Sequence, residues 1–180
     1  MKPTYVHSAT GKLESVLLCP PTYLSLEPID KISKDLIAKG GGIDRDRAAK
    51  EHQALVDIYQ HNNVNVEMIT PSYELHAQVF ARDFGFNLKE GYVLGQFTEP
   101  VRMPEHELYT AKLAELNVPM IAECKAGIIE GGDFWQLDET TLAIGGGNDL
   151  MKRYCRSSKT ARPAWLQYYP RTCEIGISTS

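Results

Sequence analysis

Two segments of this chain, residues 83–95 and 133–145, resemble each other and lie fifty positions apart. Each begins with an aspartate and continues as an apolar stretch, a polar turn and a second apolar stretch. A second charged residue precedes each aspartate, Arg82 in the first copy and Glu130 in the second. A repeat of this period is typical of a supersecondary unit that buries its apolar face only against neighbouring copies. We therefore expect the copies to pack together and to bring their charged residues into one place.

The apolar pattern around the repeat predicts an α/β fold. The predicted segments are strands at residues 12–18, 64–69, 79–80 and 120–121, helices at 45–60 and 105–116, and a hairpin in each copy. Three glycines at residues 40–42 belong to a polar connection, which we predict to be a loop or lid. The order of these elements gives a β-β-α-β unit, and such units can close around an axis like propeller blades.

Charge divides the chain into two parts. The net charge is −4, but residues 148–180 carry +4, which leaves −8 for residues 1–147. An acidic body argues against general nucleic-acid binding and suits a cationic small-molecule partner. The chain contains no apolar run approaching the roughly 18 residues of a membrane span, and its first residues do not form a signal peptide. Four cysteines without CxxC spacing indicate a reduced, cytoplasmic setting.

The periodicity stops after the three glycines at residues 145–147. We therefore expect a domain at residues 1–147 and a basic, unpatterned tail at residues 148–180. One interpretation is a disordered tail. The other is an out-of-frame segment, because residues 148–173, back-translated with one choice of synonymous codons and read two nucleotides later, give an amphipathic helix followed by an apolar strand.

Two motifs resemble signatures of a known superfamily. Val-Phe-Ala-Arg-Asp at residues 79–83 and Ile-Glu-Gly-Gly-Asp at residues 129–133 are similar to motifs of the guanidino-group-modifying enzymes, which include dimethylarginine dimethylaminohydrolases, arginine deiminases and amidinotransferases. The segments at residues 6–17 and 51–55 fit the superfamily as well. The resemblance covers about residues 5–147. It implies the pentein fold, a five-bladed α/β propeller, with about three blades present in a C-terminally truncated or frameshifted chain.

The resemblance also implies roles for individual residues. Asp83 would grip the substrate guanidinium, with Arg82, Asp133 and Phe80 as further substrate-binding residues. Glu130 would be catalytic, contacting the guanidinium or the catalytic histidine and tuning its protonation. A planar cation with several N–H donors is well matched by carboxylates in a cleft of low dielectric. The alternative is structural: Asp83 and Glu130 could pair with Arg82 or cap turns.

The chemistry of the superfamily needs a cysteine thiolate and a histidine. No histidine follows Gly147, and Cys173 lies in the unpatterned tail, so we expect no robust turnover. Superfamily members also often carry an aspartate where this chain has Ala77. His52 and His61 are nine positions apart, which is not the spacing of a helical metal pair, so neither a metal nor another cofactor is predicted.

Three hypotheses for function remain open. The first is a hydrolase or transferase that acts on guanidino groups of arginine-like substrates through a covalent thiouronium intermediate. The second is a non-catalytic module that keeps only the guanidinium-binding residues. The third is an interaction protein that uses its basic tail. The exposed strand edges of an open three-blade arc would favour a homodimer, whereas neither a membrane nor a nucleic acid is an expected partner.

Overall fold

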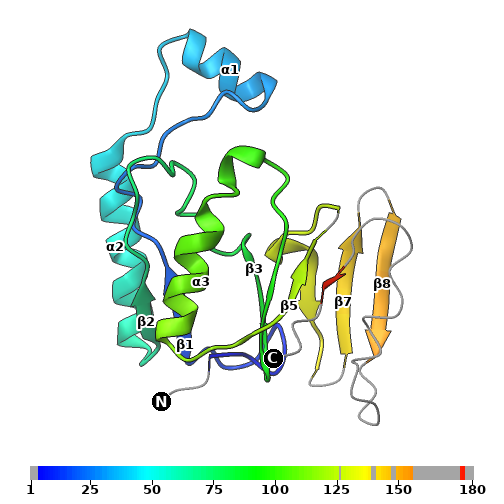
Figure 1. Cartoon of the computed structure of the whole chain (residues 1–180). Helices are drawn as coiled ribbons and strands as arrows, with labels where there is room; N and C mark the ends of the chain where they lie inside the picture. Colours follow the sequence, from blue (N-terminus) through cyan, green and yellow to red (C-terminus); the bar gives the residue numbers. More distant parts are fainter. Residues whose placement is uncertain (1–3, 126, 139–140, 147–148, 156–174, 177–180) are drawn as a thin grey trace.

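The computed structural model describes residues 4–125, 127–138, 141–146, 149–155 and 175–176, which form three sheets and three α-helices (Figure 1). The strands are β1 (Ser15–Leu18), β2 (Asn65–Met68), β3 (Gly85–Leu88), β4 (Gly91–Leu94), β5 (Met120–Cys124), β6 (Phe134–Gln136), β7 (Thr141–Gly146), β8 (Asp149–Cys155) and β9 (Ile175–Gly176). The helices are α1 (Lys31–Ala38), α2 (Arg45–His61) and α3 (Glu105–Glu115). The predicted mixed α/β class is confirmed.

The first sheet consists of β1 and β2, which are parallel and paired from Ser15–Asn65 to Leu18–Met68. Helix α2 connects these strands, as the predicted helix at residues 45–60 requires, and the side chain of Asp44 caps its first turn by accepting from the Arg47 N–H. The strands predicted at residues 12–18 and 64–69 are confirmed with tighter limits.

Helix α1 corrects the prediction that the connection before residues 40–42 lacks regular structure. Asp30 and Ser33 form a capping box at its start, and Gly40, with a φ of +75°, follows its end. No residue of α1 is buried, and Figure 1 shows the helix standing away from the sheets. Its apolar residues Ile32, Leu36 and Ile37 recur at helical spacing, so the sequence did carry a signal for this helix, although the three side chains stay exposed.

The central sheet has the order β3-β4-β5-β9. Strands β3 and β4 form the predicted hairpin, and α3 then leads into β5, which is parallel to β4. The predicted β-β-α-β unit is therefore present here. The short strand predicted at residues 79–80 is wrong, because this segment forms consecutive turns in which Phe80 N–H donates to the Ala77 carbonyl and Asp83 N–H to the Phe80 carbonyl.

The second copy of the repeat forms the third sheet, with the order β6-β7-β8. Strands β6 and β7 are the hairpin equivalent to β3 and β4. Strand β8 begins at Asp149 and pairs antiparallel with β7, although the sequence of the basic tail shows no strand period. Among the described residues the three sheets remain separate, and none closes on itself.

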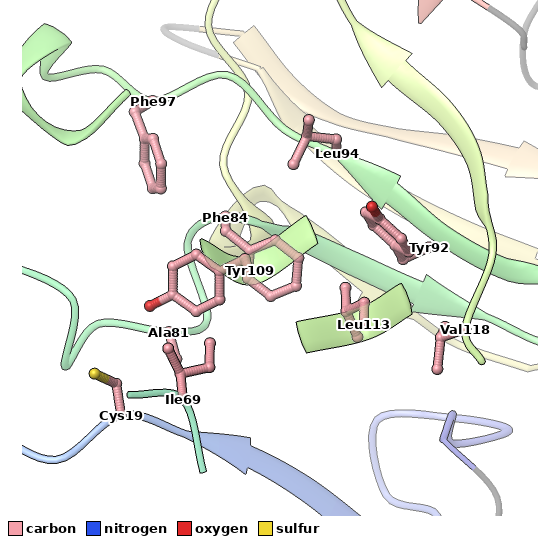
Figure 2. Close-up of a cluster of buried hydrophobic side chains, with 10 residues drawn as sticks. All are labelled: Cys19, Ile69, Ala81, Phe84, Tyr92, Leu94, Phe97, Tyr109, Leu113 and Val118. Carbon is pink, nitrogen blue, oxygen red and sulfur yellow. The ribbon is translucent and has the colours of Figure 1, made fainter. Parts of the chain in front are cut away.

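The core lies on both faces of β4, as the alternation of side chains along a strand requires. Tyr92 and Leu94 point toward α3, where Phe84 and Tyr109 stack with ring centroids 4.5 Å apart (Figure 2). Val93 points the other way, into a cluster with β6 and β7. That second cluster contains Val93, Ala122, Cys124, Ile129, Phe134, Leu142 and Ile144. The central sheet is thus covered by α3 on one face and by the second copy on the other.

No helix among the described residues combines the length and apolar composition that a bilayer span requires.

A partly buried histidine beside this core, His106, makes the stability of the fold depend on pH. The His106 ring stacks on Phe97 at 4.7 Å between centroids, and its buried Nε2 has no hydrogen-bond partner among the described residues. Burial lowers the pKa of His106, and the charge of Arg102 adds to this against the opposing charge of Glu123. The folded state therefore binds fewer protons than the unfolded chain at mildly acid pH.

We expect the free energy of unfolding to be steady above pH 6.5 and to fall as the pH drops below that value, since the unfolded histidine protonates first. Thermal melts from pH 7.5 to pH 5 measure this. His106→Phe keeps the stacked ring without the titrating group and should reduce the acid-induced loss of Tm. His61→Gln on the exposed end of α2 is the control. Equal acid sensitivity of His106→Phe and the wild type would contradict the assignment.

Candidate functional site

The two copies of the repeat meet at Asp83 and Gly131. The Gly131 N–H donates to the Asp83 carbonyl oxygen at 3.0 Å, and Arg82 of the first copy donates to the Phe134 carbonyl of the second at 3.3 Å. Gln96 and Ile129 form an isolated antiparallel bridge beside this contact. The backbones that carry Asp83 and Glu130 are therefore adjacent.

Gly131 makes this approach possible. A Cβ on Gly131 would overlap the backbone carbonyl oxygens of Arg82 and Gly85, whereas one on Gly132 would meet nothing within 4 Å. A Gly-Gly pair in a substrate-binding motif can also let the backbone approach a substrate closely. The structure shows a different use for Gly131, because it lets the second copy reach the turn that carries Asp83.

A buried arginine that the sequence analysis missed occupies the centre of the site. Arg102, 8% exposed, donates through Nη1 to Asp83 Oδ2 at 2.7 Å. Its Nε and Nη2 donate to the two oxygens of Glu105, each at 3.0 Å, and Nη2 also reaches the Phe80 carbonyl at 3.1 Å. Its Cζ lies 4.3 Å from the centroid of the Phe97 ring. With a longer hydrogen bond of 3.5 Å from Nη2 to the Ala77 carbonyl, this guanidinium is held by two carboxylates, two backbone carbonyls and an aromatic face.

The position of Arg102 follows from the start of α3. A short 3-10 helix, Pro100–Arg102, leads into α3, so that Arg102 and Glu105 are three positions apart on one side of the chain. Glu105 is 1% exposed although it is charged. The sequence could have indicated this buried pair only through the three-residue spacing of an arginine and a glutamate at the predicted helix start. Such pairs are common on exposed helices as well.

Burial and the neighbouring charges act in opposite directions on the pKa values of Arg102 and Glu105. Burial raises the pKa of Glu105, the Arg102 guanidinium lowers it, and the charges of Asp83 and Glu130 raise it further. Burial by itself would lower the pKa of Arg102, but the hydrogen bonds and charges of Glu105 and Asp83 outweigh burial and raise it. Glu105 and Asp83 thus act on one buried cation, Glu130 adds a third carboxylate to the same region, and the resulting excess of negative charge suits a cationic ligand.

Glu130 and Asp133 cap the short turn between Ile129 and β6. Glu130 N–H donates to Asp133 Oδ2 at 2.9 Å, and the Glu130 side chain accepts from the Asp133 N–H in return. Glu130 Oε1 also accepts from the Thr98 N–H at 2.8 Å. The capping alternative considered for Glu130 is therefore present in the structure, and Asp133 takes part in it.

Asp83 pairs with Arg102 rather than with its neighbour Arg82. Its side chain is 27% exposed, and among the described residues only Oδ2 has a partner, which leaves Oδ1 open. Phe80 is 55% exposed, and its ring centroid lies 5.9 Å from Arg102 Cζ. Of the five sequence-derived candidates, Asp83 and Phe80 surround the arginine directly, whereas Arg82, Glu130 and Asp133 line the junction between the copies.

The other reactive side chains lie elsewhere. Cys19 is buried in the core, and burial, assisted by the charge of Glu105, raises the pKa of its thiol to about 12. A thiol with that pKa is almost entirely protonated at neutral pH and is a poor nucleophile. The His76 ring contacts Glu27 in the connection before α1. Within the described ranges no group of three His, Cys, Asp or Glu side chains is arranged to hold a metal ion, and Cys173 lies outside these ranges.

A family model and one curated relative match this chain. The model describes the eukaryotic N,N dimethylarginine dimethylhydrolase family and matches residues 20–155, so the match includes β8. The relative is the uncharacterized protein YkgA of Bacillus subtilis (strain 168), 31% identical over 143 residues. That alignment covers 79% of this chain and 49% of YkgA, so the chain spans about half the length of its relative.

Solved structures share this fold. AgrE, in a mutant complexed with L-arginine, is 25% identical with a TM-score of 0.59, and the match covers 68% of this chain and 18% of AgrE. The arginine dihydrolase ArgZ from cyanobacteria is 22% identical with a TM-score of 0.58, covering 67% and 18%. A dimethylarginine dimethylaminohydrolase, solved as an adduct with S-methyl-L-thiocitrulline, is 16% identical with a TM-score of 0.54, covering 68% and 46%.

Proposed function

Because the chain belongs to the N,N dimethylarginine dimethylhydrolase family, within the guanidino-group-modifying superfamily, we propose that it provides the guanidinium-holding part of a site for arginine-like substrates. One observation carries the proposal. The carboxylate of Asp83 already binds a guanidinium, that of Arg102, through Oδ2 at 2.7 Å, and its Oδ1 remains open at a partly exposed position. An arginine-like ligand would place its guanidinium against Oδ1.

The surroundings of Asp83 support this class of ligand. The exposed ring of Phe80 offers an aromatic face beside the carboxylate, and cations bind such faces favourably. Glu130 lies across the junction and contributes negative charge to the same region. In the whole enzyme the reaction would be hydrolysis: a cysteine thiolate attacks the guanidinium carbon, an amine leaves, and water then releases citrulline from the thiouronium intermediate.

The described residues favour binding over turnover. Their free cysteine is Cys19, which is 1% exposed in the core, and burial raises the pKa of its thiol to about 12. A binding module that retains the acidic site is therefore the second candidate function. Citrulline formation from L-arginine or dimethylarginine by this chain would favour the hydrolase, and ligand binding without citrulline would favour the module.

Asp83→Ala tests the shared basis of both functions. We expect the affinity for L-arginine, dimethylarginine or agmatine to fall by more than about tenfold, because removing one side of a hydrogen-bonded charge pair costs about 2–5 kcal/mol. Isothermal titration calorimetry measures the affinity, and thermal melts confirm that the variant is folded. Asp57→Ala, an exposed acid on α2, is the control. Unchanged binding by folded Asp83→Ala would refute the proposal.

A further inference from the structure

A second cavity, of about 80 Å³, lies between the first sheet and α3. In the pairing of β1 with β2, Ser15 is opposite Asn65 and Leu17 is opposite Glu67. These four side chains therefore share one face of the sheet, and all four residues line the cavity. In Figure 1 the last turns of α3 lie beside β1 and β2, in agreement with the contact between Lys112 and Glu67.

Asn87, near the end of β3, brings an unsatisfied acceptor to this cavity. Its Nδ2 donates to the Thr4 carbonyl at 2.7 Å, and both residues line the cavity. Because Nδ2 is used, Oδ1 is the polar atom that Asn87 can offer to another group. Oδ1 is buried and has no hydrogen-bond partner among the residues that the structure describes. A buried acceptor without a partner is rare and unfavourable, so the cavity suits a ligand that donates a hydrogen bond.

Glu67 gives the cavity its charge, because no other ionisable side chain of the described part of the chain lines it. Glu67 Oε1 accepts from Asn65 Nδ2 at 2.8 Å, whereas Oε2 lies 3.8 Å from Lys112 Nζ, beyond hydrogen-bond length. Lys112 Nζ is closer to Glu115, at 3.2 Å. Two carboxylates thus share one ammonium group, and the local charge is negative. A hydrogen-bond donor with a positive charge is therefore favoured over a neutral one.

Apolar side chains and the volume limit the size of the ligand. Leu17, Leu113, Leu116 and Val118 line the cavity and suit a short alkyl chain. A cavity of about 150 Å³ holds benzene, so one of about half that volume admits a ligand of only a few non-hydrogen atoms. The Glu67 side chain is 32% exposed, so solvent reaches this carboxylate.

We propose that this cavity binds a small primary alkylammonium ion. Its N–H groups donate to Asn87 Oδ1 and to the Glu67 carboxylate, and its alkyl chain packs against Leu113 and Leu116. At Glu67 the ion takes the place that Lys112 approaches without forming a hydrogen bond. The inference is independent of the proposed function, because Asp83 does not line the cavity.

Propylammonium chloride is the probe, titrated into the isotope-labelled full chain and followed by NMR. We expect saturable shifts of the backbone amides of Ser15, Asn87 and Leu113. 1-Propanol keeps the shape and a donor without the charge, and tetramethylammonium keeps the charge without a donor. Each should bind at least about tenfold more weakly, a change of 1.4 kcal/mol. Equal binding of 1-propanol, or no saturable shift with propylammonium, would overturn the inference.

Substitutions at Glu67 and Lys112 should act in opposite directions. Glu67→Gln keeps an acceptor for Asn65 without the charge and should raise the Kd of propylammonium at least about tenfold. Lys112→Met removes the competing ammonium group and should lower the Kd. Asp57→Asn, on the exposed face of α2, is the control and should bind as the wild type does. Unchanged binding by Glu67→Gln, with its fold confirmed by thermal melts, would overturn the inference.

Asp83→Ala separates this cavity from the guanidinium site. The variant should bind propylammonium with the Kd of the wild type even where it has lost L-arginine. Loss of propylammonium binding in folded Asp83→Ala would place the ion beside Asp83 and overturn the inference. Saturable propylammonium binding by a chain that does not bind L-arginine would support the inference and refute the proposed function alone.

Discussion

Gly131→Ala should destabilise the fold by at least about 3 kcal/mol, at or above the upper end of the usual cost of overpacking. The new methyl group would overlap the carbonyl oxygens of Arg82 and Gly85. These are backbone atoms, which cannot rotate away as a side chain would. The overlap can be relieved only if the two copies of the repeat move apart, and this movement breaks the hydrogen bond from Gly131 to Asp83. Urea denaturation followed by circular dichroism measures the free energy of unfolding.

Gly132→Ala is the matched control, because it adds the same methyl group one position further along. A Cβ on Gly132 meets no atom of the described residues within 4 Å, so its free energy of unfolding should stay within about 0.5 kcal/mol of the wild type. Because the Asp83 turn moves with the junction, Gly131→Ala should also weaken L-arginine binding. Similar stability of the two variants would show that the copies do not meet as described.

The elements that sequence reasoning located best are those whose apolar period was recognised or that belong to the repeat. Helix α2 and strands β1 and β2 follow apolar periodicity closely, and the β3–β4 and β6–β7 hairpins follow from the repeat. Helix α1 buries no side chain and was missed. The strand predicted at residues 79–80 failed for another reason: the carbonyl of Phe80 is used by Arg102, a residue of a later element. No local pattern reveals such a long-range contact.

Long-range contacts also escaped the sequence-based prediction of the candidate site. The motifs directed attention to Asp83 and Glu130, and the structure brings their backbones together through Gly131. The motifs did not reveal that Asp83 is paired with Arg102, nor that Glu105 is fully buried beside it. An arginine and a glutamate three positions apart usually form an exposed pair, and only tertiary burial makes this one central.

Asp83 therefore has a structural and a functional use that do not exclude each other. Its Oδ2 completes the partners of a buried cation, and its Oδ1 is the atom proposed for the ligand. Asp83→Ala should consequently lower stability as well as affinity. Stability and affinity must be separated by a change that acts on the buried pair without altering Asp83 itself.

Glu105→Leu is the first half of that change and by itself should be the most destabilising substitution on α3. Removing one partner of a buried ion pair costs about 3–5 kcal/mol, because the other charge remains buried without its counterion. Glu105 is 1% exposed and binds Arg102 through both oxygens, but Arg102 keeps Asp83 as a second carboxylate partner, so we expect the lower end of this range. Glu107→Leu, an exposed position two residues along α3, should change the free energy of unfolding by about 0.5 kcal/mol or less.

Combining Glu105→Leu with Arg102→Met should recover most of the lost stability, since apolar side chains of similar volume often replace a buried ion pair at little cost. The double variant would then be folded while Asp83 has lost its hydrogen bond to the Arg102 guanidinium. We expect urea denaturation to show the recovery and calorimetry to show that L-arginine binding stays weak. Recovery of both properties together would mean that Arg102 serves the stability of the fold alone.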